Sequence, residues 1–406
     1  MIVCKFGGSV ILGKKGVNFI KKQVSLNQER KIIVVSAIGK GARKSDKKLT
    51  DLLFEAYYNR NTKAFNRLFE KIMRKIINFC KKLQINYCDI ICFDNFKKNF
   101  SNKSVEWIVS RGEYYTAKIV AKYLNYRFLP SENILIGDKF DYIDLYKCKI
   151  NIIKEDFSLP CVVPGYYYSS PNNKICLFKR GGGDVSAAVI AKLLNCSKYE
   201  NYTNVNGILT FSPSIYTGGQ TIKNMTYFQA YLCTKSGATV FANEAIKYLF
   251  NSSVKTYIMN AKNSNKLNSE IGSNSTFYYL HKCEKFYKYN QHKKTKKHLL
   301  IQAFFNDFMS HNSDIYELIY YKNSIYYLKK NSMQNMYDYC LKLFNCNNKK
   351  IVKNIRSLCK EYKIKFIKKG VYYKFNYQTF YLIGNCSNDF FKKMNEILKG
   401  LTTQNG

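Results

Sequence analysis

One short run of residues restricts the fold of this chain more than any other. Residues 31–38 read KIIVVSAI, a near-continuous apolar stretch rich in β-branched side chains. Such a stretch is typical of a central parallel strand that is buried on both faces. It ends in small residues at 36–41, and ligands of open α/β sheets bind at the carboxyl ends of strands. Ser36 therefore lies either at a ligand site or, as is more usual for a lone serine, at an ordinary cap.

The first ten residues, MIVCKFGGSV, predict a strand that is stopped by Gly7 and Gly8. A short basic loop follows at residues 13–16, and the apolar spacing over residues 17–24 predicts a helix. A strand, a glycine pair and a helix can hold a phosphate, because glycine backbone can approach an anion closely and point N–H groups at it. Lys5 would add a positive charge there. A lysine before two glycines also occurs often by chance, so this motif alone leaves the phosphate site open.

A second glycine loop, residues 176–190 (CLFKRGGGDVSAAVI), is more specific. Three consecutive glycines carry a large entropic cost unless the backbone must approach something closely. Arg180, before them, can bind a carboxylate in bidentate fashion. Asp184, after them, is placed either as the N-cap of the following helix or as a partner for Lys5 or a metal ion.

Two further predicted helices carry polar groups of interest. Residues 49–56 share an apolar helical face, with Thr50 near its start. Residues 105–124 open with an apolar patch and then follow a helical period, which places Glu113 in the first helical turn beside Gly112. The helix dipole favours a carboxylate in that turn. The functional alternative is that Glu113 binds an ammonium group of a substrate.

The remaining elements alternate between strands and helices. A buried strand at residues 159–165 ends in a Pro-Gly turn before Tyr166. The other expected elements up to residue 259 are helices within 57–99, a hairpin turn at 172–173, an alternating segment at 199–213, a helix near 225–231 and a strand at 254–259. This alternation predicts an α/β fold.

The C-terminal part has a different pattern. Residues 281–298 are basic and poorly periodic, so we expect a linker there. We expect a catalytic domain at 1–265, a basic linker at 266–297 and an α+β region at 298–406. Within the last region the expected elements are a strand at 299–305, a helix near 307–311, strands near 315–328, a helix near 333–343, a strand or helix at 351–362, a hairpin at 364–383 and a helix at 388–399.

The chain is strongly basic, with 66 Lys and Arg against 27 Asp and Glu in 406 residues, a formal net charge of +39. Such a charge could serve a nucleic-acid partner. However, the excess lysine is spread along the whole chain together with much Asn, Ile and Tyr, the residues that A/T-rich codons encode. We therefore favour codon bias and expect no specific nucleic-acid partner.

Fourteen cysteines are scattered without a second close pair, and the sequence has only four His. This spacing does not match a zinc site, so we expect buried, reduced thiols. Strand-like residues begin at once, so we expect no signal peptide. No apolar run approaches the length of a membrane span. We expect a cytoplasmic protein without a membrane partner.

Seven blocks occur along the chain in a fixed order. They are residues 5–9 (KFGGS), 34–37 (VVSA), 49–53 (LTDLL), 110–113 (SRGE), 165–166 (GY), 180–184 (RGGGD) and 203–208 (TNVNGI). Together they closely resemble the aspartokinases of the amino acid kinase family over about residues 1–265. The tail from about residue 298 is placed like the ACT regulatory region of these enzymes.

The resemblance implies a three-layer α/β/α catalytic domain with a mostly parallel sheet, followed by an ACT-like region. It implies transfer of the γ-phosphoryl group of ATP to the β-carboxylate of L-aspartate, giving 4-phospho-L-aspartate for lysine, threonine and methionine synthesis. Such chemistry depends on positioning and charge neutralisation. The implied partners are L-aspartate, ATP, Mg²⁺ and a second copy of the chain, paired through the C-terminal region.

The resemblance also implies roles for individual residues. Lys5 would bridge the transferred phosphoryl group and the acceptor carboxylate, and Asp184 would orient this lysine and Mg²⁺. Arg180 and Glu113 match the groups that bind the substrate's carboxylate and ammonium. The other matching positions are those of the aspartate site, Ser36, Thr50 and Tyr166, and those of the nucleotide site, Gly7, Gly8, Gly181, Gly182, Thr203, Asn204, Gly207 and Leu209. No set of protein metal ligands is assigned.

Several positions depart from the family pattern. They are Ser9, Lys179, Gly183, Asn204, Leu209, Ser212 and Thr239. Asn204 replaces an acidic residue and Thr239 replaces a nucleotide-contacting lysine, so the ATP side departs more than the aspartate side. One alternative is therefore a catalytically weakened or dead regulatory homologue. Another is a family member that acts on glutamate, carbamate or a nucleotide, although residues 110–113 and 49–53 favour aspartate.

Overall fold

The chain divides into two compact units, each described by itself. The first contains Met1–Gly207, Thr226–Tyr231 and Thr239–Ser273, and the second contains Ile208–Met225, Leu232–Ala238 and Asn274–Gly406. The computed structural model describes residues 1–41, 46–138, 142–179, 181–210, 218–235, 238–250, 252–263, 267–272, 279–282, 286–289, 315–321, 324–329, 340–344, 349–372, 377–383 and 387–399.

The first unit is built on a mostly parallel sheet in the order β3-β4-β2-β1-β7-β9-β10, in which β10 pairs antiparallel with β9. Its strands are β1 (Ile2–Phe6), β2 (Arg30–Val35), β3 (Arg127–Phe128), β4 (Cys161–Pro164), β7 (Lys198–Thr203), β9 (Lys255–Asn260) and β10 (Leu267–Ile271). The last four residues of β2 and all of β4 are apolar and buried on both faces, whereas β7 also carries the buried polar residues Glu200 and Asn201. The expected α/β class is confirmed, and the apolar run at 31–38 forms β2 and the loop after it.

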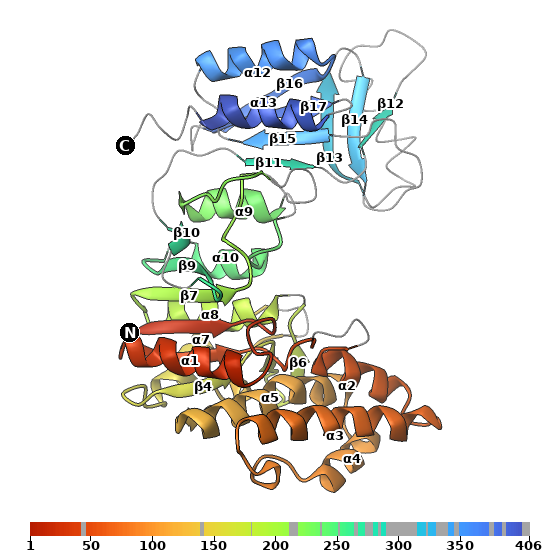
Figure 1. The fold of residues 1–406 in the computed structure, drawn as a ribbon, viewed down its shortest axis with the longest axis vertical. Coiled ribbons are helices and arrows are strands. Elements are labelled where there is room, and N and C mark those ends of the chain that lie inside the picture. Colours follow the sequence, from red (N-terminus) through yellow and green to blue (C-terminus); the bar gives the residue numbers. More distant parts are fainter. Residues whose placement is uncertain are drawn as a thin grey trace. The chain divides into compact units, whose positions relative to one another are not determined.

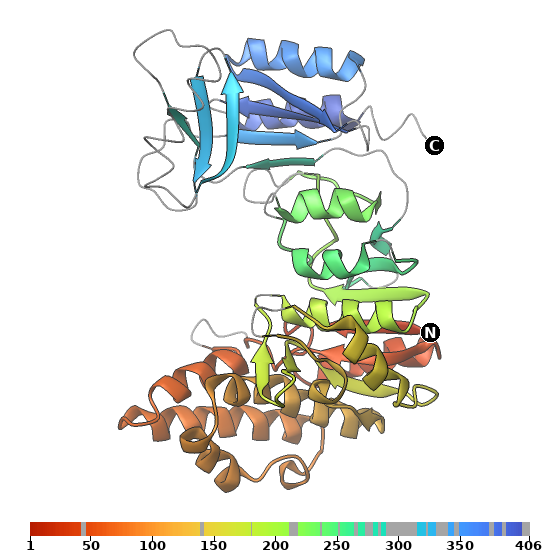
Figure 2. The same cartoon turned by 180° about the vertical axis from the view of Figure 1, so that it is seen from behind.

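One face of this sheet is covered by a group of helices. They are α1 (Lys14–Leu26), α2 (Leu49–Tyr58), α3 (Ala64–Lys82), α4 (Phe93–Asn102) and α5 (Val105–Leu124), with a short 3-10 turn, η1 (Tyr87–Asp89). Figures 1 and 2 both show α3, α4 and α5 gathered on the same side of the sheet. Their apolar faces share one core with Cys4 and Phe6 of β1.

The opposite face carries α8 (Gly182–Leu193), which contacts β1, β2 and β7. The α7 helix (Leu145–Ile153) and the α10 helix (Asn243–Leu249) pack against α8. The unit also contains α6 (Ser131–Ile134) and the start of α9 (Tyr227–Lys235). Helices on both faces of a largely parallel sheet make the expected three-layer α/β/α arrangement, which is confirmed.

The position of Glu113 corrects one prediction. The α5 helix spans Val105–Leu124 without interruption, so Glu113 lies in its interior and not in a first turn. Gly112 lies within the helix, where the absence of a side chain permits close packing against neighbouring residues. A Cβ at Gly112 would lie 2.9 Å from Thr50 Cγ2 and 3.3 Å from the Ala37 Cβ. The dipole explanation for Glu113 is therefore wrong.

The start of α8 corrects a second prediction. Gly181, with φ of +84°, is the N-cap, and the helix begins at Gly182. Asp184 therefore lies inside the first helical turn and is not the N-cap. Two of the three glycines are helical, so the helix starts earlier than their flexibility suggests. A carboxylate inside the first turn still benefits from the helix dipole.

The hairpin expected at residues 172–173 is confirmed. It joins β5 (Tyr167–Ser169) to β6 (Ile175–Leu177), which pair antiparallel. Asn173 has φ of +58°, a conformation that asparagine tolerates better than most residues. This hairpin follows directly on Tyr166 and leads towards the second glycine loop.

The second unit is α+β. Its larger sheet is antiparallel in the order β11-β15-β17-β16, made of β11 (Tyr279–Lys282), β15 (Cys340–Phe344), β17 (Tyr377–Ile383) and β16 (Lys365–Tyr372). A second sheet contains β12 (Phe286–Tyr289), β14 (Ser324–Lys329) and β13 (Ile315–Tyr321), of which β13 and β14 lie side by side in Figure 2. The α12 helix (Lys349–Glu361) packs against α13 (Asn388–Lys399), and β8 (Asn224–Met225) also belongs here.

Several predictions for this unit can be compared with these elements. The hairpin at 364–383, the strands near 315–328 and the helix at 388–399 are confirmed, and 351–362 is helical. The helix expected to reach 343 is wrong there, because residues 340–344 form a strand. Strands β11 and β12 fall within the expected linker, where aromatic residues between the lysines favour strands. The strand and helix expected at 299–311 lie outside the described residues.

No helix in the described part of the chain has the length and apolar character that a membrane span requires.

Candidate active site

Lys5 and Asp184 form a buried ion pair at the carboxyl end of the central strands. Lys5 Nζ lies 2.6 Å from Asp184 Oδ1, and the two side chains are 13% and 8% exposed. β1 supplies the lysine, and the first turn of α8 supplies the carboxylate. Low exposure strengthens the attraction between the charges. The structure thus brings together the two residues that the sequence analysis selected as the catalytic pair.

Asn201 of β7 contacts both members of this pair. Its Nδ2 donates to Asp184 Oδ1 at 3.1 Å, and its Oδ1 accepts from Lys5 Nζ at 3.4 Å. In the parallel pairing of β1 with β7, Lys5 stands opposite Asn201. Asn201 is fully buried. Lys5, Asp184 and Asn201, called here the charged triangle, therefore form one hydrogen-bonded group.

The second oxygen of Asp184 is bound from another segment. The backbone N–H of Ala242 donates to Asp184 Oδ2 at 3.1 Å. A Cβ at Gly181 would lie 2.6 Å from the Ala242 Cβ, so a glycine is required for this close approach. Tyr199 is also nearby: burial, and then the charge of Asp184, raise the pKa of its hydroxyl well above its ordinary value. Asp184 is thus fixed from several sides.

The glycines near the charged triangle permit close backbone packing. The N–H of Gly7 donates to the Tyr202 carbonyl at 3.2 Å, so the sheet already uses this donor. A Cβ at Gly8 would lie 3.2 Å from the Ala37 carbonyl oxygen. A Cβ at Gly183 would lie 3.5 Å from Lys5 Cε. Contrary to the expectation from the sequence, the Gly7 N–H is therefore not free to point at a phosphate. Nucleotide binding by this loop stays a prediction.

Glu113 supplies a buried carboxylate at the same edge of the sheet. Its Oε1 accepts from the Ala37 N–H at 3.2 Å, and Ala37 follows Ser36 after β2. Its Oε2 is buried and has no hydrogen-bond partner among the residues that the structure describes. Burial raises the pKa of Glu113 to about 8, although the bond from Ala37 lowers it. A buried, unpaired carboxylate oxygen is costly unless a ligand completes it.

Three further predicted residues lie around Glu113 and the charged triangle. A Cβ at Gly182 would lie 3.0 Å from Tyr166 Cδ2, and burial, followed by the charges of Glu113 and Asp51, raises the pKa of Tyr166 to about 12. Ser36 Oγ would lie 3.4 Å from a Cβ at Gly183. Thr50 stands in the first turn of α2, against α5. The structure therefore places these positions, expected to line the aspartate site, near one another.

Tyr166 has an unusual backbone conformation for a bulky residue. Its φ is +78°, in the region that favours glycine. Its N–H donates to Ser186 Oγ at 3.2 Å, which ties this turn to α8. Strain of this kind persists where the surroundings impose it, and it is common at functional sites.

Four of the expected nucleotide-binding residues lie at the end of β7 and in the segment that follows it. Thr203 ends β7, and its carbonyl accepts from the Ala261 N–H at 2.8 Å. Thr203 Oγ1 also donates to Asn204 Oδ1 at 3.5 Å. Gly207 has φ of +84°, which a residue with a side chain adopts only under strain. Leu209 belongs to the second unit, where it pairs with Thr221. Gly181 and Gly182 open α8, and Arg180 lies outside the described residues.

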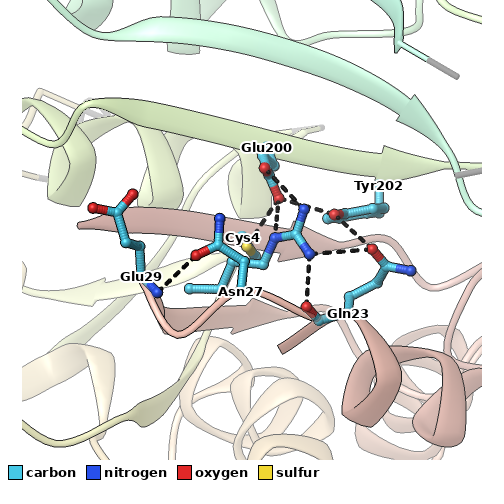
Figure 3. A network of polar contacts seen from close by, with 7 residues as sticks. Cys4, Gln23, Asn27, Glu29, Glu200 and Tyr202 are labelled. Carbon is cyan, nitrogen blue, oxygen red and sulfur yellow. Dashed lines mark hydrogen bonds and ion pairs between the residues drawn. The ribbon is translucent and has the colours of Figure 1, made fainter. Parts of the chain in front are cut away.

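The other face of β1 and β7 carries a second polar network (Figure 3). Arg30 binds Glu200 in bidentate fashion, with Nε to Oε2 at 2.8 Å and Nη2 to Oε1 at 3.2 Å. The Tyr202 hydroxyl also donates to Glu200, at 2.9 Å, and Gln23 accepts from Arg30 through its backbone carbonyl at 2.6 Å. Cys4 donates its thiol to Glu200 at 3.4 Å. We call Cys4, Gln23, Arg30, Glu200 and Tyr202 the arginine network.

The residues present can be tested for their fit to Mg²⁺. Among the described residues, no three His, Cys, Asp or Glu side chains are grouped so that they could hold a metal ion. Mg²⁺ is usually bound by one or two carboxylates together with substrate phosphates. Asp184 Oδ1 already accepts two bonds, whereas Oδ2 accepts one, from Ala242. Asp184 Oδ2 therefore retains a lone pair and fits such a shared ion.

Sequence reasoning missed Asn201 and Ala242. Asn201 stands in a strand and belongs to no recognised motif, and its contact with Lys5 depends on register between segments 196 residues apart. Ala242 acts through its backbone, so its side chain gave no signal. The sequence offered no clear signal for Asn201, because β7 reads KYENYT and mixes polar with aromatic residues.

The fold and the site define a class of protein. A mostly parallel α/β sheet carries, at the carboxyl ends of its strands, a lysine–aspartate pair beside glycine loops and a buried carboxylate, the location where such sheets bind ligands. Residues 1–260 match the model of the amino acid kinase family. The chain therefore belongs to the amino acid kinase family.

Curated relatives of this chain include aspartokinases. Aspartokinase 3 of Bacillus subtilis is 24% identical over 282 residues, which are 65% of this chain and 62% of that protein. The bifunctional aspartokinase/homoserine dehydrogenase of Daucus carota is 21% identical over 64% of this chain and 31% of its own length. The matched part thus spans less than two thirds of each relative.

Solved structures show the same fold over nearly the whole chain. Aspartate kinase of Clostridium acetobutylicum superposes with a TM-score of 0.82 at 20% identity, covering 98% of this chain and 99% of that one. Aspartokinase III of Escherichia coli, in complex with aspartate and ADP, gives a TM-score of 0.72 at 14% identity, covering 98% and 100%. These likenesses confirm the fold of the chain.

Proposed function

We propose that the protein is an ATP-dependent aspartate kinase that phosphorylates the β-carboxylate of L-aspartate. One observation carries this proposal most strongly. Glu113 presents a buried carboxylate oxygen without a partner among the described residues, at the same sheet edge as the charged triangle. An amino-acid acceptor offers the ammonium group that completes such an oxygen, which a carbamate or a simple phosphate acceptor lacks.

The charged triangle supports phosphoryl transfer. Catalysis of this reaction requires neutralisation of charge on the transferred group and alignment of the two substrates. Lys5 supplies a positive charge that Asp184 holds in place. Because the pair is largely buried, its field acts with little screening by water. We assign Lys5 and Asp184 as the catalytic residues.

The remaining roles follow from this assignment. Glu113 would bind the ammonium group of aspartate, Arg180 its α-carboxylate, and Ser36, Thr50 and Tyr166 would line the acceptor site. The nucleotide would contact Lys5 and the loops that contain Gly7, Gly8, Gly181, Gly182, Thr203, Asn204, Gly207 and Leu209. The Escherichia coli relative was solved with aspartate and ADP, which supports both substrates.

We propose Mg²⁺ as the metal cofactor. Asp184 Oδ2 would hold it together with the nucleotide phosphates, and the ion would neutralise phosphate charge when bound. Within this arrangement Asp184 Oδ1 binds Lys5, and Oδ2, which accepts one bond from Ala242, would hold Mg²⁺. That division explains why Ala242 and Asn201 must fix the orientation of the carboxylate.

The wider assignments are also proposals. We place the catalytic domain at 1–265, a basic linker at 266–297 and an ACT-like region at 298–406, through which two copies of the chain would pair. The antiparallel sheet and the helices α12 and α13 of the second unit support an α+β regulatory module. We propose a cytoplasmic enzyme of lysine, threonine and methionine synthesis, with no specific nucleic-acid partner and no membrane partner.

The proposal is tested by ADP release from ATP and Mg²⁺ with L-aspartate, with L-glutamate and without an acceptor. Hydroxylamine in the same reactions traps an acyl phosphate as its hydroxamate. We expect ADP release and hydroxamate with aspartate alone. Hydroxamate with glutamate would move the acceptor assignment to another amino acid. No ADP release with any acceptor would favour the alternative, a catalytically weakened or dead homologue, for which Asn204 and Thr239 are the candidate causes.

A further inference from the structure

Asn201 lies beside the catalytic pair and contacts both of its members, and this arrangement allows only one orientation of its amide. Oδ1 faces Lys5 Nζ at 3.4 Å, and Nδ2 faces Asp184 Oδ1 at 3.1 Å. A flipped amide would place its NH₂ against the ammonium and its oxygen against the carboxylate, and both contacts would be repulsive. The two charged groups therefore determine the orientation of the Asn201 amide, and the amide in turn restricts the positions of Lys5 Nζ and the Asp184 carboxylate.

The contact with Asn201 restricts the orientation of the Lys5 ammonium group. An ammonium group has three N–H donors in tetrahedral directions. Among the residues that the structure describes, Asp184 Oδ1 and Asn201 Oδ1 accept from Lys5 Nζ. With two directions occupied, the rotation of the ammonium is fixed and the third N–H has one direction left. If Asn201 were absent, Asp184 Oδ1 alone would hold the ammonium, and both Lys5 Nζ and the Asp184 carboxylate would be less restricted in position.

We infer that Asn201 is a positioning residue that aims the third N–H of Lys5 at the transferred phosphoryl group. This inference rests on the proposed function for the identity of the target, but the orienting contact itself is independent of any substrate. Asn201 is fully buried and stands opposite Lys5 in the parallel pairing of β1 with β7. It can therefore act on Lys5 without touching a substrate. Precise alignment of a charged donor matters because a displacement of about 1 Å can change a rate by about 100-fold.

The first test compares Asn201→Leu with Tyr202→Phe. Leucine has nearly the shape of asparagine and no hydrogen-bonding groups. Tyr202→Phe is the matched control, since it is the next residue of β7 and loses buried hydrogen bonds to Glu200 and Gln23 on the other face. We expect Asn201→Leu to lower kcat by about 10- to 100-fold, with little change in KM for ATP or aspartate. Tyr202→Phe should leave kcat within about twofold.

The second test uses Asn201→Asp, which keeps the shape and adds a carboxylate beside Asp184. Two adjacent carboxylates do not both ionise readily, so the pair takes up a proton at a higher pH than an isolated carboxylate. We expect a new ionisation in the pH profile of kcat that the parent enzyme lacks. A residue that only supports the fold would change stability and leave the shape of this profile unaltered.

A third measurement does not depend on turnover. The rate at which Lys5 is acetylated is followed by mass spectrometry in the ligand-free protein. Acetylation requires a free amine, and Asn201→Leu removes one of the two acceptors that hold the ammonium. We expect faster acetylation of Lys5 in Asn201→Leu and an unchanged rate in Tyr202→Phe.

The outcomes separate this inference from the proposed function. If the parent protein shows no turnover with any acceptor, the proposed function fails, and the acetylation rates still decide whether Asn201 holds Lys5. Normal kcat, an unaltered pH profile and an unchanged acetylation rate in the Asn201 variants would overturn the inference even in an active kinase. A rise in KM for one substrate at constant kcat would also overturn it, because it would place Asn201 in binding.

Discussion

The two faces of β1 and β7 carry networks of similar composition but different design. On one face Lys5, Asp184 and Asn201 form the charged triangle. On the other face Arg30 and Glu200 form the centre of the arginine network (Figure 3). Each network contains a buried cation, a buried carboxylate and a neutral polar partner. Because side chains alternate along a strand, neighbouring residues of the same strand enter opposite networks.

The difference lies in how completely the charges are satisfied. Arg30 bonds both oxygens of Glu200 and also Gln23, and Glu200 further accepts from Tyr202 and Cys4. Burial, and then the charge of Glu200, raise the pKa of Cys4 well above its ordinary value, so this thiol is unreactive. A planar guanidinium suits such a closed network, whereas an ammonium is a compact charge with donors that remain adjustable. The difference supports our proposal that the charged triangle serves catalysis, whereas the arginine network stabilises the fold.

The largest expected effect on stability comes from breaking the arginine network. Arg30→Met removes a partly buried cation and leaves the buried carboxylate of Glu200 without its ion-pair partner. Loss of one member of a buried ion pair costs about 3 to 5 kcal/mol, which urea unfolding measures. The control is Arg74→Met, whose pair with Glu70 is exposed and contributes about 0.5 kcal/mol or less. A kcat that falls in proportion to the lost stability at Arg30 would contradict the separation of the two faces.

Glu113→Gln tests the acceptor side. The change removes the charge that would bind the ammonium of aspartate, so we expect KM for aspartate to rise by about 10-fold or more, with KM for ATP unchanged. Because burial raises the pKa of Glu113 to about 8, the parent protein holds this carboxyl protonated at lower pH. Its affinity for aspartate should therefore increase as pH rises towards about 8 and then level off.

The Gln variant should lack this pH dependence. The same raised pKa means that ionisation of Glu113 destabilises the folded protein as pH rises through about 8. Glu113→Gln should therefore raise the free energy of unfolding more at pH 9 than at pH 6. Parallel pH profiles of KM for aspartate in the parent and the variant would show that Glu113 does not bind the ammonium.

The smallest expected effect is at the edge of the arginine network. Gln23→Ala removes a side-chain oxygen that accepts from Tyr202 at 3.2 Å and from Arg30 at 3.3 Å. The backbone carbonyl of residue 23 still binds Arg30, so we expect a loss of about 1 kcal/mol. The measurement is a thermal or urea unfolding curve. A change in kcat as large as that in Asn201→Leu would show that the two faces are coupled.

The sequence predicted two members of the charged triangle, Lys5 and Asp184, but gave no indication of the arginine network, and the reason is physical. Apolar runs and glycine loops are local signals, so β2, the start of α8 and the candidates Lys5 and Asp184 could be selected without a structure. Arg30 and Glu200 lie 170 residues apart and meet only through strand register. Asn201 was missed for the same reason. Gly112 misled the prediction of the helix start, because a glycine used for close packing between helices looks the same in sequence as one that ends a helix.

The most direct test compares two neighbouring residues of β1 that face opposite networks. Aspartyl hydroxamate formation from ATP, Mg²⁺ and L-aspartate is measured for the parent protein, Lys5→Ala and Cys4→Ala. The account predicts hydroxamate from the parent and from Cys4→Ala at similar rates, and a loss of about 10² to 10³ in Lys5→Ala, with both variants folded by circular dichroism. Near-normal hydroxamate formation by Lys5→Ala, or none by the parent protein, would contradict the account.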